Sequence, residues 1–185
     1  MTRKSELFTK QYTKENLCVT KVPPKLFPQE RDWTCSIACI RTITSAFGRG
    51  PKDEDWYISN FNLSPGLHYS KDIKEKRILQ GYTVEYGCDY TNFEFDNLVK
   101  LLGQGYYIMV EGIINYGHWL VLLGYYTLGA KNDLENNLVL LYDPYYDELK
   151  LIRADEFNKI WQGGEFDNTG VTHDFIAIYK WDTRL

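Results

Sequence analysis

The stretch 28–48, PQERDWTCSIACIRTITSAFG, carries most of the information about the fold and the chemistry of this chain. From Cys35 onward the apolar residues recur at helical spacing until Gly48, which predicts a helix over residues 33–47 with the cysteine in its first turn. A thiol at that position lies at the positive end of the helix dipole, which favours the thiolate. Gln29 lies just ahead of the helix, and its side-chain amide can donate a hydrogen bond to a developing oxyanion. The stretch therefore predicts a reactive cysteine with an oxyanion donor beside it.

A histidine and an aspartate lie far downstream, each next to an apolar run of β type. His118 opens HWLVLLGYY, and Asp143 closes LVLLYD. The imidazole can take the thiol proton and return it to a leaving group, and the carboxylate can hold the imidazole in one tautomer. The order Gln, Cys, His, Asp outlines a thiol hydrolase of papain type. We therefore expect Gln29, Cys35, His118 and Asp143 to meet in one site.

The rest of the chain reads as helices first and then strands, mostly in hairpin order. Residues 1–28 are expected to form an N-terminal arm that becomes extended from residue 17. Besides the helix at 33–47, helices are expected at residues 52–61, 71–80 (capped by Ser70), 91–102 and 154–161, and strands at residues 82–86, 106–111, 118–126, 138–142, 148–152 and 174–180. This order predicts one α+β domain, residues 1–185, in which an N-terminal helix that carries the cysteine packs on a C-terminal antiparallel β-sheet.

The composition is that of an ordinary globular protein. Hydrophobic residues make up 44% and charged residues 25% of the 185 residues, and the net charge is −4. No basic patch dominates, so nucleic acid is not an expected partner. The apolar runs are too short to span a bilayer, and the N-terminal segment lacks the apolar core of an export signal. We expect a cytoplasmic protein with free thiols, a peptide or amide substrate and no membrane partner, whereas the oligomeric state is not predicted.

Other kinds of site are weaker alternatives. Cys35 and Cys39 are four residues apart on the predicted helix, but the chain has no CxxC pair and no HExxH motif, so no metal is expected. No Gly-rich phosphate loop is present either, and no cofactor is expected. Cys39 and Cys88 are interpreted as small core residues, and His68 and His173 as structural or surface residues.

Three motifs resemble a known family. QERDWTCSIAC resembles the signature around the nucleophile in bacteriocin-processing-type cysteine peptidases of the papain-like superfamily. GHWLVLLGYY resembles their His-bearing strand, and LYDPYYDELKLIRADEFNKIW resembles their Asp-Pro segment with the short helix that follows. The core from Asp32 to Cys39 and the closing DFIAIY are also similar to a branch named "guanylyl cyclase domain-containing". The matches span residues 29–180, although residues 49–103 match nothing specific.

The resemblance implies a papain-like fold, a triad of Cys35, His118 and Asp143, and Gln29 as the oxyanion donor. The peptidases usually have Gly directly after the cysteine, where this chain has Ser36, which would crowd the oxyanion side. The leading hypothesis is a thiol hydrolase that cleaves a peptide or related amide bond through an acyl-thioenzyme, or a transferase if the acyl acceptor is not water.

Two further hypotheses belong to other functional classes. The first is a catalytically silent papain-like module that holds a peptide in a groove lined by Tyr106, Tyr107, Tyr116, Trp119, Tyr145 and Tyr146. The second is a nucleotide-handling enzyme of the cyclase-named branch, although the chain shows no recognisable pair of metal-binding carboxylates and no triphosphate cradle.

Overall fold

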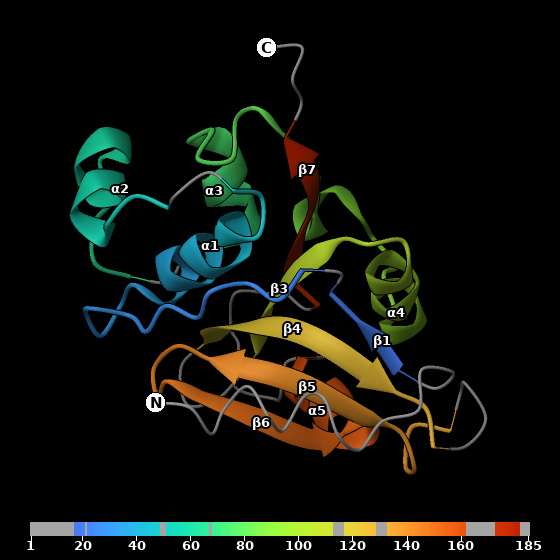
Figure 1. Ribbon diagram of the computed structural model, residues 1–185. Coiled ribbons are helices and arrows are strands. Elements are labelled where there is room, and N and C mark those ends of the chain that lie inside the picture. The colour runs from blue at the N-terminus through green and yellow to red at the C-terminus, as the bar shows by residue number, and fades with distance from the viewer. Residues whose placement is uncertain are drawn as a thin grey trace.

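The computed structural model describes residues 17–20, 22–48, 51–66, 68–112, 117–128, 133–161 and 173–181. The helices are α1 Cys35–Ser45, α2 Glu54–Phe61, α3 Ser70–Glu75, α4 Phe95–Gly103 and α5 Ala154–Trp161, with a short 3-10 turn η1 Gly87–Asp89. The strands are β1 Leu17–Val19, β2 Tyr82–Tyr86, β3 Tyr107–Gly112, β4 His118–Tyr126, β5 Leu138–Asp143, β6 Glu148–Arg153 and β7 Phe175–Trp181. The predicted α+β architecture is confirmed: the helix that begins at Cys35 packs on an antiparallel sheet formed mainly by the second half of the chain (Figure 1).

The described strands form one antiparallel sheet in the order β2-β7-β3-β4-β5-β6, and β1 pairs with the end of β4. Strands β3 to β6 are neighbours in chain order, as the sequence indicates, but β7 lies between β2 and β3. Val121 of β4 pairs with Tyr142 of β5. Because β4 and β5 are antiparallel, the first residues of β4 and the last residues of β5 lie at the same end of the sheet.

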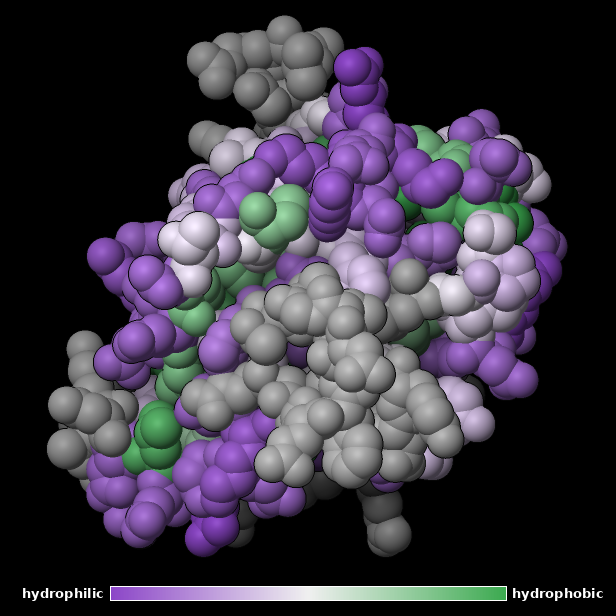
Figure 2. Space-filling model, turned by 180° about the vertical axis from the view of Figure 1, so that it is seen from behind, coloured by the Kyte–Doolittle hydropathy of each residue, from purple (hydrophilic) through white to green (hydrophobic). Residues whose placement is uncertain are grey.

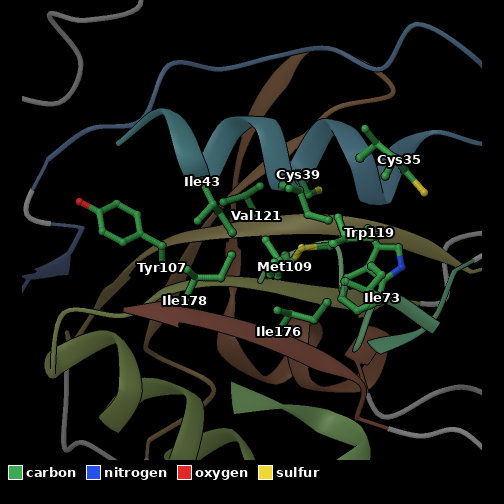
Figure 3. Packing of buried hydrophobic residues seen from close by; sticks show 14 of the residues in the cluster. Cys35, Cys39, Ile43, Ile73, Tyr107, Met109, Trp119, Val121, Ile176 and Ile178 are labelled. Carbon is green, nitrogen blue, oxygen red and sulfur yellow. The ribbon is translucent and has the colours of Figure 1, made fainter. Parts of the chain in front are cut away.

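Helices cover both faces of the sheet and enclose two hydrophobic clusters (Figure 1). Successive strand residues point to opposite faces, so Trp119 and Val121 join the cluster under α1, whereas Leu120 and Leu122 join the cluster under α4 and α5. Figure 3 shows the first cluster, with Cys39 and Ile43 of α1 above Val121 and Met109 of the sheet. The central sheet is therefore hydrophobic on both faces.

Helix α1 is buried over most of its length, since residues 35–44 are all buried. Its isoleucines are fully buried in the first cluster: Ile37, Ile40 and Ile43. The helix gives way to a turn after Ser45, and Gly48 then has a φ of +69°, a conformation that favours glycine. The predicted helix over residues 33–47 is thus confirmed, with Cys35 as its first residue rather than its third.

Helix α3 is shorter than predicted and has a different start. It ends at Glu75, and Arg77 adopts a φ of +56°, which an α-helix does not allow. Ser70 is the first helical residue and not the cap: its hydroxyl accepts a hydrogen bond from the backbone N–H of Cys88 at 3.0 Å, and its own backbone N–H donates to the buried carboxylate of Asp174 at 2.7 Å. This partner comes from 104 residues away in the chain, so local sequence gives no sign of it.

Helix α4 also begins later than predicted, at Phe95 instead of residue 91 or 92. The side chain of Asn97 accepts a hydrogen bond from the backbone N–H of Glu94 at 3.0 Å, which fixes the start of the helix. Helix α5 matches its predicted range, whereas α2 ends at Phe61 as predicted but begins at Glu54 instead of residue 52 or 53, with Asp53 as its cap.

The described residues on the face seen in Figure 2 are mostly hydrophilic. Figure 2 shows, on the side opposite to Figure 1, small separate hydrophobic areas among polar residues. Among the described residues the exposed large hydrophobic side chains are scattered over several elements: Val22, Trp56, Tyr90, Leu128, Tyr145, Tyr146, Leu151 and Tyr179. No helix in the described part of the chain has the length and apolar character that a bilayer crossing requires. Of the predicted N-terminal arm, residues 1–16 lie outside the described part, and Leu17–Val19 pair with β4.

Candidate active site

Cys35 is the first residue of α1 and is only 5% exposed. Thr34 precedes it as the N-cap residue, but no side chain caps the helix and no acidic residue lies in its first turn. The first-turn N–H groups are therefore left without a capping side chain, at the positive end of the helix dipole. In Figure 3, Cys35 lies at the end of the first hydrophobic cluster, close to Trp119.

His118 is held at the start of β4, after Gly117, whose φ of +80° favours glycine. Its Nε2 lies 2.7 Å from Oδ1 of Asp143, which leaves Nδ1 as the ring nitrogen available to a thiol. Burial lowers the pKa of His118, but hydrogen bonds and negative charge from Asp143 and Cys35 outweigh it and raise the pKa to about 9. The imidazole therefore lies between the thiol and the carboxylate.

Asp143 is the last residue of β5, and its side chain is fully buried. Oδ1 also accepts a hydrogen bond from the backbone N–H of Tyr145 at 3.0 Å, and Oδ2 accepts one from Lys150 Nζ at 2.8 Å. Burial raises the pKa of Asp143, but the hydrogen bonds and positive charges of His118 and Lys150 outweigh it and lower the pKa to about 2. The carboxylate is thus ionised at neutral pH and has a donor on each oxygen.

The structure brings Cys35, His118 and Asp143 together, and it also adds a residue that sequence reasoning missed. Lys150 lies on β6, where it pairs with Leu141, two residues before Asp143. Residues that pair directly, and those two further along, share one face of a sheet. The register of the β5–β6 hairpin could have identified Lys150. In this register Glu148 pairs with Asp143, so Lys150, two residues after Glu148, lies on the same face of the sheet as Asp143.

Gln29 lies on the segment before α1, against the turn that follows Asp143. Its backbone N–H donates to the carbonyl of Pro144 at 3.0 Å. Its side-chain Nε2 donates to the carbonyl of Arg31 at 2.8 Å, while Oε1 is buried and has no hydrogen-bond partner within the described residues. One N–H of the amide thus serves the loop itself, and its role as an oxyanion donor stays a prediction.

A buried ionic network, which the sequence did not indicate, anchors the loop ahead of Cys35. Glu54 of α2 is fully buried, and it accepts a hydrogen bond from the backbone N–H of Glu30 at 3.1 Å. Arg41 of α1 contacts both carboxylates, at 2.6 Å from Glu30 and 3.8 Å from Glu54. Thr34 adds two hydrogen bonds to the backbone of Arg31, at 2.9 and 3.1 Å. These contacts connect the loop to both helices.

The other cysteines and histidines whose side chains the structure describes are Cys39, Cys88, His68 and His173. Cys39 is fully buried, and burial raises its thiol pKa well above the usual range. Cys88, which we expected in the core, is exposed on η1. The backbone carbonyl of His68 accepts a hydrogen bond from the indole of Trp119 at 2.9 Å, and His173 packs against Trp161. Within the described ranges no group of three potential metal ligands gathers.

The predicted tyrosine-lined groove is not formed as expected. Tyr107 and Trp119 are buried in the first hydrophobic cluster, and Tyr106 packs against Tyr179. Tyr116 lies outside the described residues. Two members of the set are exposed: Tyr145, whose ring centroid is 6.3 Å from that of His118, and Tyr146, whose ring centroid is 4.9 Å from that of Tyr145. The two-sided core explains the difference, because a strand that is covered on both faces buries successive residues, as β3 does along its whole length.

Ser36, the departure from the peptidase signature, is 1% exposed, and its hydroxyl has no hydrogen-bond partner in the described part of the chain. It is a buried residue in the first turn of α1, so the position that is usually Gly lies inside the packed part of the fold.

Comparison with known proteins supports the fold. No protein-family model matches the chain, and no curated protein is similar to it in sequence. Among solved structures, the peptidase domain of Streptococcus ComA, a bifunctional ABC transporter involved in a quorum-sensing pathway, matches with a TM-score of 0.51. The match covers 84% of this chain and 96% of that domain at 16% sequence identity. At this identity the likeness shows the fold alone, which is the papain-like α+β fold that the motifs implied.

Proposed function

We propose that this protein is a thiol hydrolase that cleaves a peptide or related amide bond through Cys35, His118 and Asp143. The observation that carries the proposal is the position of the imidazole, with its Nε2 at 2.7 Å from a buried carboxylate and with Cys35 near enough to contribute to the raised pKa of His118. A fold shared with a peptidase domain supports the same reaction class.

The arrangement suits a two-step acyl transfer. The sulfur of Cys35 attacks the substrate carbonyl carbon, and its proton passes to His118. His118 then gives that proton to the leaving amine, the C–N bond breaks, and a thioester remains on the sulfur. In the second step His118 takes a proton from water, the hydroxide attacks the thioester, and the acid product and the thiol are released. Asp143 stays ionised throughout and stabilises the imidazolium.

The start of α1 supports the oxyanion step. The tetrahedral intermediate carries a negative charge close to the sulfur, where the backbone N–H of Cys35 and the positive end of the helix dipole lie. No carboxylate lies in the first turn to oppose that charge. The amide of Gln29 is the second donor in this proposal, once its free N–H turns toward the substrate.

A peptide-library digest tests the proposal. We would incubate the protein with a mixed peptide library and identify new termini by mass spectrometry, with Cys35→Ala as the inactive variant and Cys88→Ala as the matched control. We expect cleavage by the parent and by Cys88→Ala, because Cys88 is an exposed thiol outside the site. Loss of all cleavage in Cys35→Ala with an unchanged fold supports the proposal.

Two results would replace it with another function. Cleavage that persists in Cys35→Ala would exclude a cysteine nucleophile at this site. Peptide binding without any cleavage by the folded parent would favour the silent binding module, and GTP turnover that survives the loss of Cys35 would favour the nucleotide-handling enzyme.

A further inference from the structure

We propose that Lys150 is a positioning residue of this site, which fixes the carboxylate of Asp143 and offsets its charge while His118 changes its protonation state. The inference rests on the proposed function and assigns a role to a residue outside the predicted triad. Three observations carry it: the hydrogen bonds of the carboxylate, the location of the lysine, and the balance of charge around the imidazole.

The first observation is that the two oxygens of Asp143 have separate donors. Oδ1 faces His118 and the backbone N–H of Tyr145, and Oδ2 faces the ammonium of Lys150 at 2.8 Å. Because the Asp143 side chain is fully buried, loss of the ammonium leaves Oδ2 without its donor and without access to water. A buried carboxylate oxygen without a donor favours rotation of the carboxyl group away from its position beside His118.

The second observation is that Lys150 is itself held in place. Its side chain is 28% exposed, and Nζ also lies 3.2 Å from Glu148 Oε1. The ammonium lies 4.7 Å from the centre of the Tyr146 ring, at cation–π distance. Two carboxylates and an aromatic ring thus surround the ammonium, whereas an ordinary surface lysine extends into solvent.

The third observation concerns charge. The charged groups that face this centre are Asp143, His118, Lys150, Glu148 and the thiolate of Cys35 when it forms. During the proposed reaction the imidazole becomes neutral each time it gives up its proton. Lys150 remains positive at that moment, so the buried carboxylate keeps one cationic partner. The positive charge of Lys150 cancels the negative charge of Asp143, and the Cys35–His118 pair has no net charge either as thiol and imidazole or as thiolate and imidazolium. The site is therefore neutral in both forms, apart from the half-exposed Glu148.

Removal of the Lys150 charge should therefore move the titration of the thiol–imidazole pair to higher pH. Without that cation, the charge of Asp143 acts on His118 alone and favours the imidazolium. Removal of one unit charge at this distance is expected to shift the pKa of the thiol–imidazole pair by about 0.5 to 2 pH units in a partly solvated site. A residue with a merely structural role would change stability but would leave this titration where it is.

The test measures the rate of iodoacetamide alkylation at Cys35 as a function of pH, followed by peptide mapping. The variants are Lys150→Met, which removes charge and donor, Lys150→Gln, which keeps an N–H donor, and Lys150→Arg, which keeps the charge. Lys159→Met is the matched control, since this surface lysine also pairs with an aspartate, Asp155, at 3.3 Å. If Lys150→Met fails to fold, Lys150→Gln answers the question, because its amide can still donate to Oδ2.

We expect the profiles of Lys150→Met and Lys150→Gln to move to higher pH, and those of Lys150→Arg and Lys159→Met to match the parent. Folded neutral variants with the parent profile would overturn the role of Lys150. An equal move in Lys159→Met would also overturn it, because the effect would then come from net charge. If parent Cys35 reacts as an ordinary thiol, the proposed function fails instead, and the NMR titration of the His118 ring in the same variants then decides whether Lys150 tunes the imidazole.

Discussion

Replacement of Asp143 by Asn is expected to remove much of the dependence of stability on pH between pH 6.5 and 9. In the folded chain the pKa of His118 is raised from 6.5 to about 9. Because the folded state binds this proton more tightly than the unfolded state, the imidazolium stabilises the fold fully below pH 6.5. That stabilisation is lost as the pH rises through 9.

The magnitude follows from the size of the change in pKa. At about 1.4 kcal/mol per pH unit, the rise to about 9 is worth roughly 3 kcal/mol of stability at pH 6. The His118 side chain is only 12% exposed, so solvent screens little of this energy. Asp143 supplies part of the effect and Cys35 the rest, so Asp143→Asn should remove at least about 1.4 kcal/mol, or one pH unit.

Urea unfolding followed by tryptophan fluorescence at pH 6.5, 7.5, 8.5 and 9.5 measures the effect. The free energy of unfolding of the parent should fall across this range, and that of Asp143→Asn should fall by clearly less. Asp155→Asn serves as the control, because Asp155 also pairs with cations, Arg153 and Lys159, but at the surface. If Asp143→Asn keeps the full slope of the parent, the electrostatic coupling of His118 to Asp143 that we describe is wrong.

Three further predictions concern neighbouring groups. The pKa of Asp143 is lowered from 3.8 to about 2, so its stabilisation is present above pH 3.8 and is lost as the pH falls through 2. Urea unfolding in the acid range should therefore show about 2 kcal/mol more loss of stability in the parent than in Asp143→Asn, and equal losses would contradict this. Gln29→Ala should lower kcat by about 10²–10³ and leave KM within a few fold, as expected for loss of an oxyanion donor; an unchanged kcat in steady-state peptide hydrolysis would exclude that role. Trp119→Phe leaves the buried carbonyl of His68 without its donor and should cost about 1–3 kcal/mol in urea unfolding; the exposed Trp56→Phe is the control, and equal losses in both would contradict this account.

The helix that begins at Cys35 and the core strands were predictable because their signals are local. The spacing of the apolar residues after Cys35 is typical of a helix with one strongly apolar face. The predicted strand from His118 to Tyr126 has the same bounds as β4. Helix α5 is also predicted at its observed bounds. A long segment with a strong periodic pattern of apolar residues is compatible with only one type of secondary structure.

Helix starts were less predictable where a distant side chain supplies the hydrogen bond. Ser70 is of a residue type that favours the N-cap position, but its hydroxyl accepts a hydrogen bond from the backbone N–H of Cys88 and its own N–H donates to Asp174, so α3 begins at Ser70 itself. The position of β7 between β2 and β3 was also not predictable, because local strand propensity does not specify which strands pair with each other.

The sequence by itself determined the α+β class, the residue types of the candidate site and their order along the chain, because each of these depends on local pattern and side-chain chemistry. Only the tertiary structure decided that the imidazole meets a fully buried carboxylate, that Lys150 binds the far oxygen, and that Glu54 anchors the loop ahead of the thiol. The physical reason is distance: these contacts join residues 7 to 25 positions apart, and strand register and helix docking, which no local pattern encodes, bring them within hydrogen-bond range.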